Sequence, residues 1–159
     1  MTPDPDRVCD FLKETAEADI LPRFRDLAEH HVMEKTPGDL VTIADLDAEK
    51  RLTRLLTEHV PGSTVVGEES VHGDPALLEQ LETLDDLWII DPVDGTHNFA
   101  NGESPFGIVI AYLHGGKVRG AWIHEPIAGD TAVAAEGSGA WIGDRRLAVA
   151  AGADIDDLT

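Results

Sequence analysis

Residues 88–99 read WIIDPVDGTHNF and are the most informative stretch of this chain. The first three are apolar and predict a buried β-strand, which runs directly into two carboxylates, Asp91 and Asp94. Pro92 fixes the backbone between the two acids, and Gly95 permits a tight turn immediately after them. This local geometry can aim both carboxylates at one point beyond the end of a strand.

A second apolar run upstream delivers acids in the same way. Residues 64–66 are followed by Gly67 and then by Glu68 and Glu69. If the two strands are neighbours in one sheet, at least three carboxylates converge at its edge. Two like charges about 4 Å apart repel by roughly 4 kcal/mol at an effective dielectric constant of 20, so bare acids would either take up protons or separate. The convergence therefore predicts bound divalent cations.

The residue types indicate which cation and which substrate group the site would take. Oxygen ligands without paired His or Cys select Mg²⁺, Mn²⁺ or Ca²⁺, and Mg²⁺ is the usual ion where carboxylates share it with a phosphate. The backbone amides of Gly95, Thr96 and His97 could donate to phosphate oxygens if they open a helical turn. A pair of acids in so acidic a chain is usually only a solvated surface, so the position of these acids at two strand ends is what favours a site.

The remaining pattern predicts an α+β fold in a single domain, residues 1–159. Two amphipathic helices come first, at residues 6–33 with a bend at Pro22 and at residues 46–60. Short apolar runs then suit strands at residues 64–66, 87–90, 106–113, 118–123, 131–135 and 140–142, with turns at 114–117 and 143–144. We expect the two amino-terminal helices to pack on a largely antiparallel sheet.

Composition and charge exclude several classes of protein. The 31 Asp and Glu residues against 12 Lys and Arg give a formal charge of −19, which repels nucleic-acid backbones and anionic membrane surfaces. The longest apolar run, residues 106–113, is too short to span a bilayer. The first 17 residues carry no secretory signal pattern, and the single Cys9 cannot form an internal disulfide. We therefore expect a cytoplasmic protein without nucleic-acid or membrane partners.

Three motifs resemble the inositol monophosphatase family in order and spacing. They are DPVDGTHNF at residues 91–99, GEES at residues 67–70, and Lys35 followed by DLVTIAD at residues 39–45. The later GSGAW at residues 137–141 also fits the family. The resemblance implies a Mg²⁺-dependent phosphoric monoester hydrolase, inhibited by Li⁺, with this chain as the amino-terminal half of a layered αβ sandwich.

The resemblance also implies a set of metal ligands. Glu68, Asp91 and the main-chain carbonyl of Val93 would hold one Mg²⁺. Asp91 and Asp94 would contribute to a second ion, with Asp91 bridging the two. A third, weaker ion would depend on Glu68, and Mn²⁺ could replace Mg²⁺.

Catalytic roles follow from the same resemblance. Asp45 and Thr96 would form a hydrogen-bonded pair that orients the metal-activated water, which is the nucleophile. Lys35 would modulate metal and phosphate binding, and the backbone of Gly95 and Thr96 would contact the phosphate. His97 occupies the variable position of the motif, where contact with solvent, a metal-bound water or the substrate remains open.

Several alternatives remain open from the sequence. An inositol-phosphate-like monoester is the family default, but fructose-1,6-bisphosphatases, histidinol-phosphate phosphatases and 3'-phosphonucleotide phosphatases share these motifs. Family members carry a further metal-binding Asp and most substrate contacts in a second half that this chain does not contain. We therefore expect weak or no activity from this chain alone. A truncated metal-binding module without activity is the rival interpretation, and a homodimer or a partner chain that completes the site is also consistent with the sequence.

Overall fold

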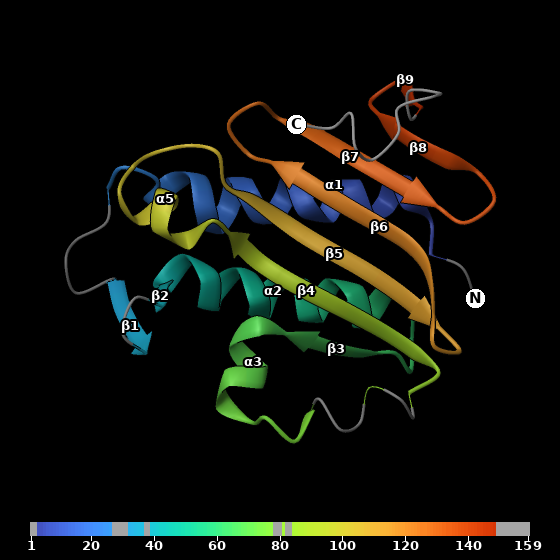
Figure 1. Cartoon of the computed structure of the whole chain (residues 1–159), viewed down its shortest axis with the longest axis horizontal. Helices are drawn as coiled ribbons and strands as arrows, with labels where there is room; N and C mark the ends of the chain where they lie inside the picture. Colours follow the sequence, from blue (N-terminus) through green and yellow to red (C-terminus); the bar gives the residue numbers. More distant parts are fainter. Residues whose placement is uncertain (1–2, 27–31, 37–38, 78–80, 82–83, 149–159) are drawn as a thin grey trace, which may run out of the picture.

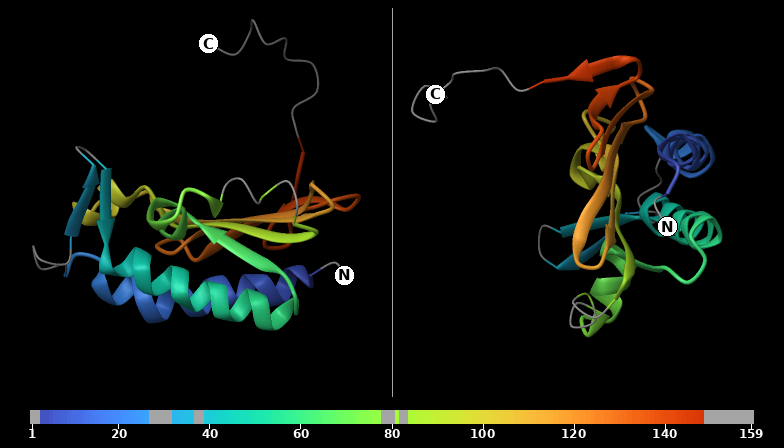
Figure 2. Two further views of the ribbon diagram at one scale, coloured as in Figure 1. Left: turned by 90° about the horizontal axis from the view of Figure 1, so that it is seen from below. Right: turned by 90° about the vertical axis from the view of Figure 1, so that its right-hand side faces the viewer.

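The computed structural model describes residues 3–26, 32–36, 39–77, 81 and 84–148, and at residues 32, 34–36 and 39–40 it describes the backbone alone. A seven-stranded sheet carries two long helices on one face (Figures 1 and 2). The helices are α1 (Pro5–Thr15), α2 (Ile43–His59), α3 (Glu68–Gly73) and α5 (Thr96–Ala100). The large sheet contains, in spatial order, β3 (Thr64–Gly67), β4 (Asp86–Asp94), β5 (Gly107–His114), β6 (Lys117–Glu125), β7 (Asp130–Ala135), β8 (Gly139–Ile142) and β9 (Arg145–Leu147).

The sheet confirms the predicted α+β class. Its β3–β4 pair is parallel, and every other neighbouring pair is antiparallel. Each predicted strand is present, and the predicted turns at 114–117 and 143–144 join β5 to β6 and β8 to β9. Gly115 and Gly116 both have positive φ, at 58° and 71°, as a two-residue hairpin turn of type I′ requires. The sequence analysis missed β9, the short helices α3 and α5, and a separate pair of strands, β1 (Val32–Thr36) and β2 (Asp39–Thr42).

The first helix is shorter than predicted. After α1 the backbone widens into a π-helical turn at Ala16–Ile20 and tightens into a 3₁₀ turn at Leu21–Arg23, where helical structure ends. Pro22 has no N–H to donate back along the helix and its ring crowds the preceding turn, so it ends the helix rather than bending it. The prediction of helix to residue 33 was therefore wrong, because the strand β1 (Val32–Thr36) begins there and pairs antiparallel with β2 (Asp39–Thr42).

The second helix begins at a capping box. Thr42 Oγ1 accepts a hydrogen bond from the Ala44 N–H at 3.2 Å, and Asp45 Oδ2 accepts one from the Thr42 N–H at 2.9 Å. These two contacts satisfy amides that a helix start otherwise leaves without acceptors. They begin α2 at Ile43, slightly before the predicted boundary at residue 46.

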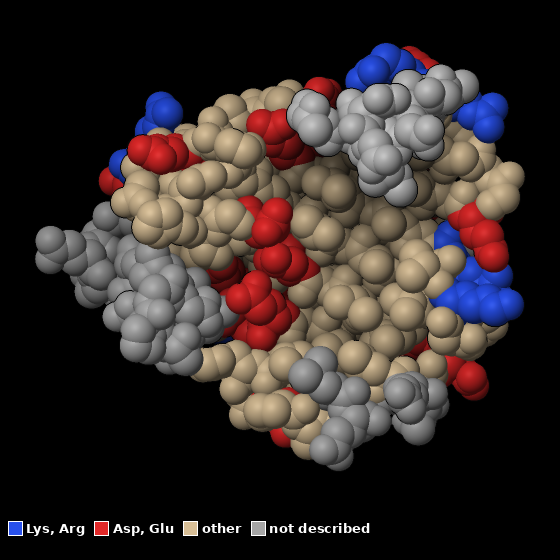
Figure 3. Space-filling view, viewed as in Figure 1, with Lys and Arg blue, Asp and Glu red and all other residues tan. Residues whose placement is uncertain are grey.

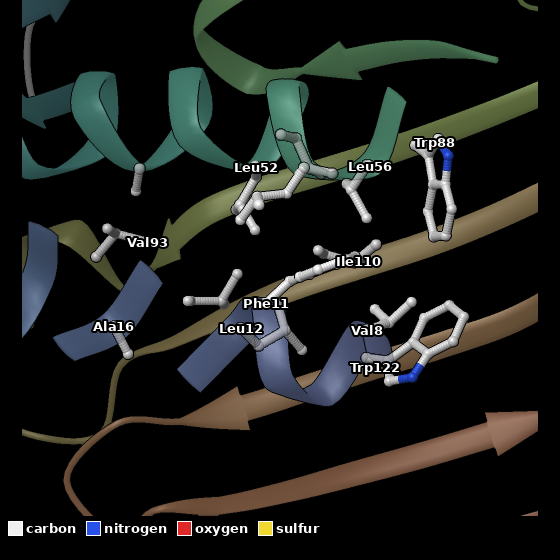
Figure 4. Close-up of a cluster of buried hydrophobic side chains, with 14 of the residues drawn as sticks. Val8, Phe11, Leu12, Ala16, Leu52, Leu56, Trp88, Val93, Ile110 and Trp122 are labelled. Carbon is white, nitrogen blue, oxygen red and sulfur yellow. The ribbon is translucent and has the colours of Figure 1, made fainter. Parts of the chain in front are cut away.

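The core lies between the two long helices and one face of the sheet. Figure 4 shows these side chains pointing toward one another: Val8, Phe11 and Leu12 of α1, Leu52 and Leu56 of α2, and Trp88, Ile110 and Trp122 of the sheet. Alternation along β4 buries Trp88 and Ile90 against the helices and turns Ile89 and Asp91 to the opposite face. That open face exposes 39% of Ile89 and 54% of Ile123. Within the described residues, no helix combines the length and apolar character needed to cross a membrane.

Candidate metal centre

The acidic residues of the two motifs lie at one edge of the sheet. β3 pairs in parallel with β4, and Gly67 lies opposite Ile90 at the end of the ladder. Parallel strands end at the same edge, so Glu68, the first residue of α3, comes close to Asp91 on β4. The condition set by the sequence, that the two strands be neighbours, is met.

At this edge, the surroundings of Asp91 disfavour its charged form. It lies on the open face in register with the apolar Val109, and its Oδ1 atom is buried without a hydrogen-bond partner. Burial raises the pKa of Asp91 to about 7, with further contributions from the charges of Glu68, Asp94 and, to a smaller extent, Asp45. Figure 3 shows acidic side chains gathered at the centre of this face, with Lys and Arg toward its periphery.

Asp45 and Thr96 form the hydrogen-bonded pair expected from the sequence. Thr96 Oγ1 lies 3.2 Å from Asp45 Oδ1 and 2.9 Å from the carbonyl oxygen of Val93. Asp45 Oδ2 accepts a hydrogen bond of 2.5 Å from the Thr42 hydroxyl. Burial raises the pKa of Asp45, although the hydrogen bonds from Thr42 and Thr96 oppose this shift. The N-terminus of α2 therefore contacts the N-terminus of α5, which follows β4.

The segment after Asp94 takes the helical turn that phosphate contact would require. Gly95 has φ 85° and ψ 33°, a left-handed conformation in which a side chain would be strained, and α5 begins at Thr96. His97 is exposed. Lys35 belongs to β1 by its backbone, and the prediction for its side chain lies outside the described residues.

The potential ligand atoms at this edge suit a hard divalent cation. The available ligands are oxygens only, and the unpartnered Asp91 Oδ1 is a buried acceptor that a cation would satisfy. In the described part of the chain, no group of three or more His, Cys, Asp or Glu side chains is already arranged to hold a metal ion. Mg²⁺ commonly takes one or two carboxylates and completes its shell with water and substrate oxygens.

An apolar hollow of about 360 Å³ adjoins the acids on the open face. Its lining includes Val66, Glu68, Val71, Ile89, Asp91 and Val109. The acids therefore stand at the border between a polar edge and an apolar surface, which explains why desolvation dominates the shift of Asp91.

Glu49 on α2 is a residue at this site that the sequence analysis missed. Its Oε2 and Oε1 atoms accept hydrogen bonds from the backbone N–H groups of Glu69 and Ser70, both at 2.9 Å. A weak signal was present, because Glu49 follows Asp45 by one helical turn and so shares its face of α2.

Comparisons with known proteins agree with this geometry. The model of the inositol monophosphatase family matches residues 7–158. A fructose-1,6-bisphosphatase/inositol-1-monophosphatase of Thermotoga maritima is 34% identical over 127 residues, which are 79% of this chain and 46% of that protein. The solved structure of an IMPase from Thermotoga maritima has a TM-score of 0.77 at 30% identity and covers 92% of this chain and 53% of that one.

A further solved structure, an IMPase/NADP phosphatase complexed with Mg²⁺ and phosphate, has a TM-score of 0.73. It is 22% identical and covers 89% of this chain and 51% of that one, so the likeness shows the shared fold alone. The chain spans about half the length of the curated relatives it matches.

Proposed function

Because the chain belongs to the inositol monophosphatase family, we propose that it supplies the metal-binding part of a Mg²⁺-dependent phosphatase acting on a small phosphate monoester. The observation that carries this proposal is the state of Asp91. A carboxylate with a buried, unpartnered oxygen and a pKa raised to about 7 by burial and by neighbouring acids is costly to the fold. Such a cost is typical of a functional site.

The proposed ligands are those that the family motif implies. Glu68, Asp91 and the Val93 carbonyl would hold one Mg²⁺, and Asp91 with Asp94 would contribute to a second, with a third ion near Glu68. When bound, Mg²⁺ would supply positive charge to the phosphate oxygens and lower the pKa of the attacking water. We expect Mn²⁺ to substitute for Mg²⁺ and Li⁺ to inhibit.

Asp45 and Thr96 would handle the proton of the attacking water. The Thr96 hydroxyl has one proton and two acceptors in reach, the Val93 carbonyl and Asp45 Oδ1. Thr96 Oγ1 can therefore accept a proton from water while it passes its own to Asp45. Because burial raises the pKa of Asp45, this carboxylate is a better proton acceptor than an exposed one.

The remaining assignments concern the substrate and the setting of the protein. The backbone amides of Gly95 and Thr96, at the start of α5, would donate to the phosphate, and Lys35 would modulate its binding. An inositol-phosphate-like monoester is the first candidate substrate, followed by fructose-1,6-bisphosphate, histidinol phosphate and 3'-phosphonucleotides. We further propose a cytoplasmic location and a homodimer.

The test is phosphate release from a panel of monoesters with and without Mg²⁺, together with calorimetric titration of Mn²⁺. We expect Mn²⁺ binding by the wild-type chain and its loss in Asp91→Asn, with only slow phosphate release. Asp85→Asn, which removes an exposed charge just before the same strand, is the matched control and should bind normally. Mn²⁺ binding that Asp91→Asn leaves unchanged would refute the proposed centre. Binding without any turnover would favour a noncatalytic metal-binding module.

A further inference from the structure

We propose that Glu49 is a positioning residue whose carboxylate fixes the turn between β3 and α3 and thereby directs Glu68 toward the metal centre. The inference rests on the proposed function, because it concerns the same centre. The motifs quoted from the sequence do not include Glu49. The contacts of its side chain carry the inference.

The carboxylate of Glu49 holds the backbone directly after Glu68. It accepts the N–H groups of Glu69 and Ser70, both at 2.9 Å and each through a different oxygen. These amides belong to the first turn of α3, where no acceptor is available within the helix. Hydrogen bonds to an ionised carboxylate are about twice as strong as neutral ones, so two of them fix this turn firmly.

The backbone directly before Glu68 is also held. The Gly67 N–H donates to Ser70 Oγ at 3.0 Å, and Ser70 is itself held by Glu49. Glu68 therefore lies between two fixed peptide units. Its side chain has little backbone freedom with which to turn away from Asp91, whose pKa its charge helps to raise.

Gly67 gives independent support for a close contact with Glu49. A Cβ atom added at Gly67 would lie 2.2 Å from Glu49 Oε2 and 2.3 Å from its Cδ. The backbone at Gly67, with φ −105° and ψ 162°, is ordinary extended chain that any residue adopts. A side chain at Gly67 would therefore displace the Glu49 carboxylate from its present position.

The position of Glu49 on α2 relates it to the catalytic pair. Asp45 and Glu49 are one turn apart on the same helix face. Asp45 contacts Thr96 at the start of α5, after β4, and Glu49 contacts the first turn of α3, after β3. One face of α2 therefore contacts both acidic segments, which follow the parallel neighbours β3 and β4.

The test compares the Mn²⁺ affinities of Glu49→Asp, Glu68→Gln and the double variant with that of the wild type. Glu49→Asp keeps the charge but is one methylene shorter, so it separates positioning from electrostatics. We expect about tenfold weaker binding in Glu49→Asp, as for other residues that orient metal ligands. We expect no further loss when it is added to Glu68→Gln. Unchanged affinity, or the same loss with and without Glu68, would overturn the inference.

A second measurement separates this inference from the proposed function. In the metal-free protein, we expect the amides of Glu69 and Ser70 to exchange hydrogen faster in Glu49→Asp and in Gly67→Ala. Glu58→Asp is the matched control, because Glu58 lies on the same helix but is exposed and contacts Arg54. A wild-type chain that binds no Mn²⁺ would refute the proposed function. Unchanged exchange of the two amides would refute the role of Glu49 alone.

Discussion

Asp86 and Asp91 belong to the same strand, β4, and meet opposite surroundings. Asp86 accepts a hydrogen bond from the Tyr112 hydroxyl and lies 2.8 Å from His114 Nδ1, and these two contacts lower its pKa. Asp91 has a buried oxygen without a partner, and burial together with neighbouring acids raises its pKa to about 7. Asp86 has two side-chain partners, whereas Asp91 has a backbone hydrogen bond at Val93 that does not offset burial and the like charges around it. The first arrangement stabilises the charged carboxylate, whereas the second disfavours it, as expected of the proposed metal centre.

The largest difference between these two aspartates should appear in metal affinity. We expect Asp91→Asn to weaken Mn²⁺ binding by at least about 100-fold, because loss of a ligand costs more than the roughly 10- to 100-fold of losing a residue that orients one. Asp86→Asn should bind Mn²⁺ as the wild type does. Calorimetric titration of both variants measures this, and an equal loss in the two would remove the distinction between the two ends of β4.

The second difference concerns stability against pH in the metal-free protein. Asp91 has a folded-state pKa near 7, above its ordinary value, and it faces Glu68, Asp94 and Asp45. The folded state therefore holds this proton more tightly, so the stabilising contribution is complete below about pH 4 and is lost as pH rises through 7. We expect Asp91→Asn to raise the free energy of unfolding by about 2 kcal/mol at pH 8. Urea denaturation at pH 5 and pH 8 tests this, and a gain of equal size at both values would contradict it.

Replacing Asp86 by Asn should change the free energy of unfolding in the opposite direction. We expect Asp86→Asn to lower the free energy of unfolding at pH 7 by about 1 to 2 kcal/mol, since it removes charge-assisted hydrogen bonds. Because the pKa of Asp86 is lowered in the folded state, this contribution is present above about pH 4 and is lost as pH falls further. In a Tyr112→Phe background, Asp86→Asn should lower the free energy of unfolding by less than it does in the wild type. Urea denaturation of both single variants and the double variant measures this. If the two single effects simply add in the double variant, the contact between Tyr112 and Asp86 contributes nothing.

The smallest effect is expected at Asp85, immediately before β4. This residue is exposed, so Asp85→Asn should change the free energy of unfolding by less than about 0.5 kcal/mol. Its Mn²⁺ titration should overlay that of the wild type. A larger change in either measurement would show that net charge near β4, and not the specific surroundings of Asp86 and Asp91, governs the behaviour of the strand.

The sequence predicted the parts of the site that depend on local pattern. Apolar runs that end in acids placed Glu68 and Asp91 at strand ends, and the ladder between β3 and β4 brings those ends together. The apolar spacing of residues 46–60 is likewise local, and it predicted the start of α2 to within a few residues. The family resemblance, and not periodicity, supplied the pairing of Asp45 with Thr96.

The parts that were missed depend on contacts between distant segments or on competing local effects. On a helix surface, Glu49 cannot be told from a solvated acid until the turn after β3 is placed against it. The same holds for Asp86, whose partners Tyr112 and His114 lie on β5, far from it in the sequence. At Pro22 the sequence analysis predicted a bend, whereas the structure ends the helix there, with extended backbone at Phe24.

The one-turn spacing of Asp45 and Glu49 limits how this helix can change in evolution. Inserting or deleting a single residue between them would rotate one carboxylate by about 100° around the helix axis relative to the other. Either the start of α5 or the first turn of α3 would then lose its contact with α2, even if every other residue were kept. We therefore expect length variation among natural homologues to be absent from this turn of α2, and to occur instead beyond the far end of the helix, near Pro61 and Gly62.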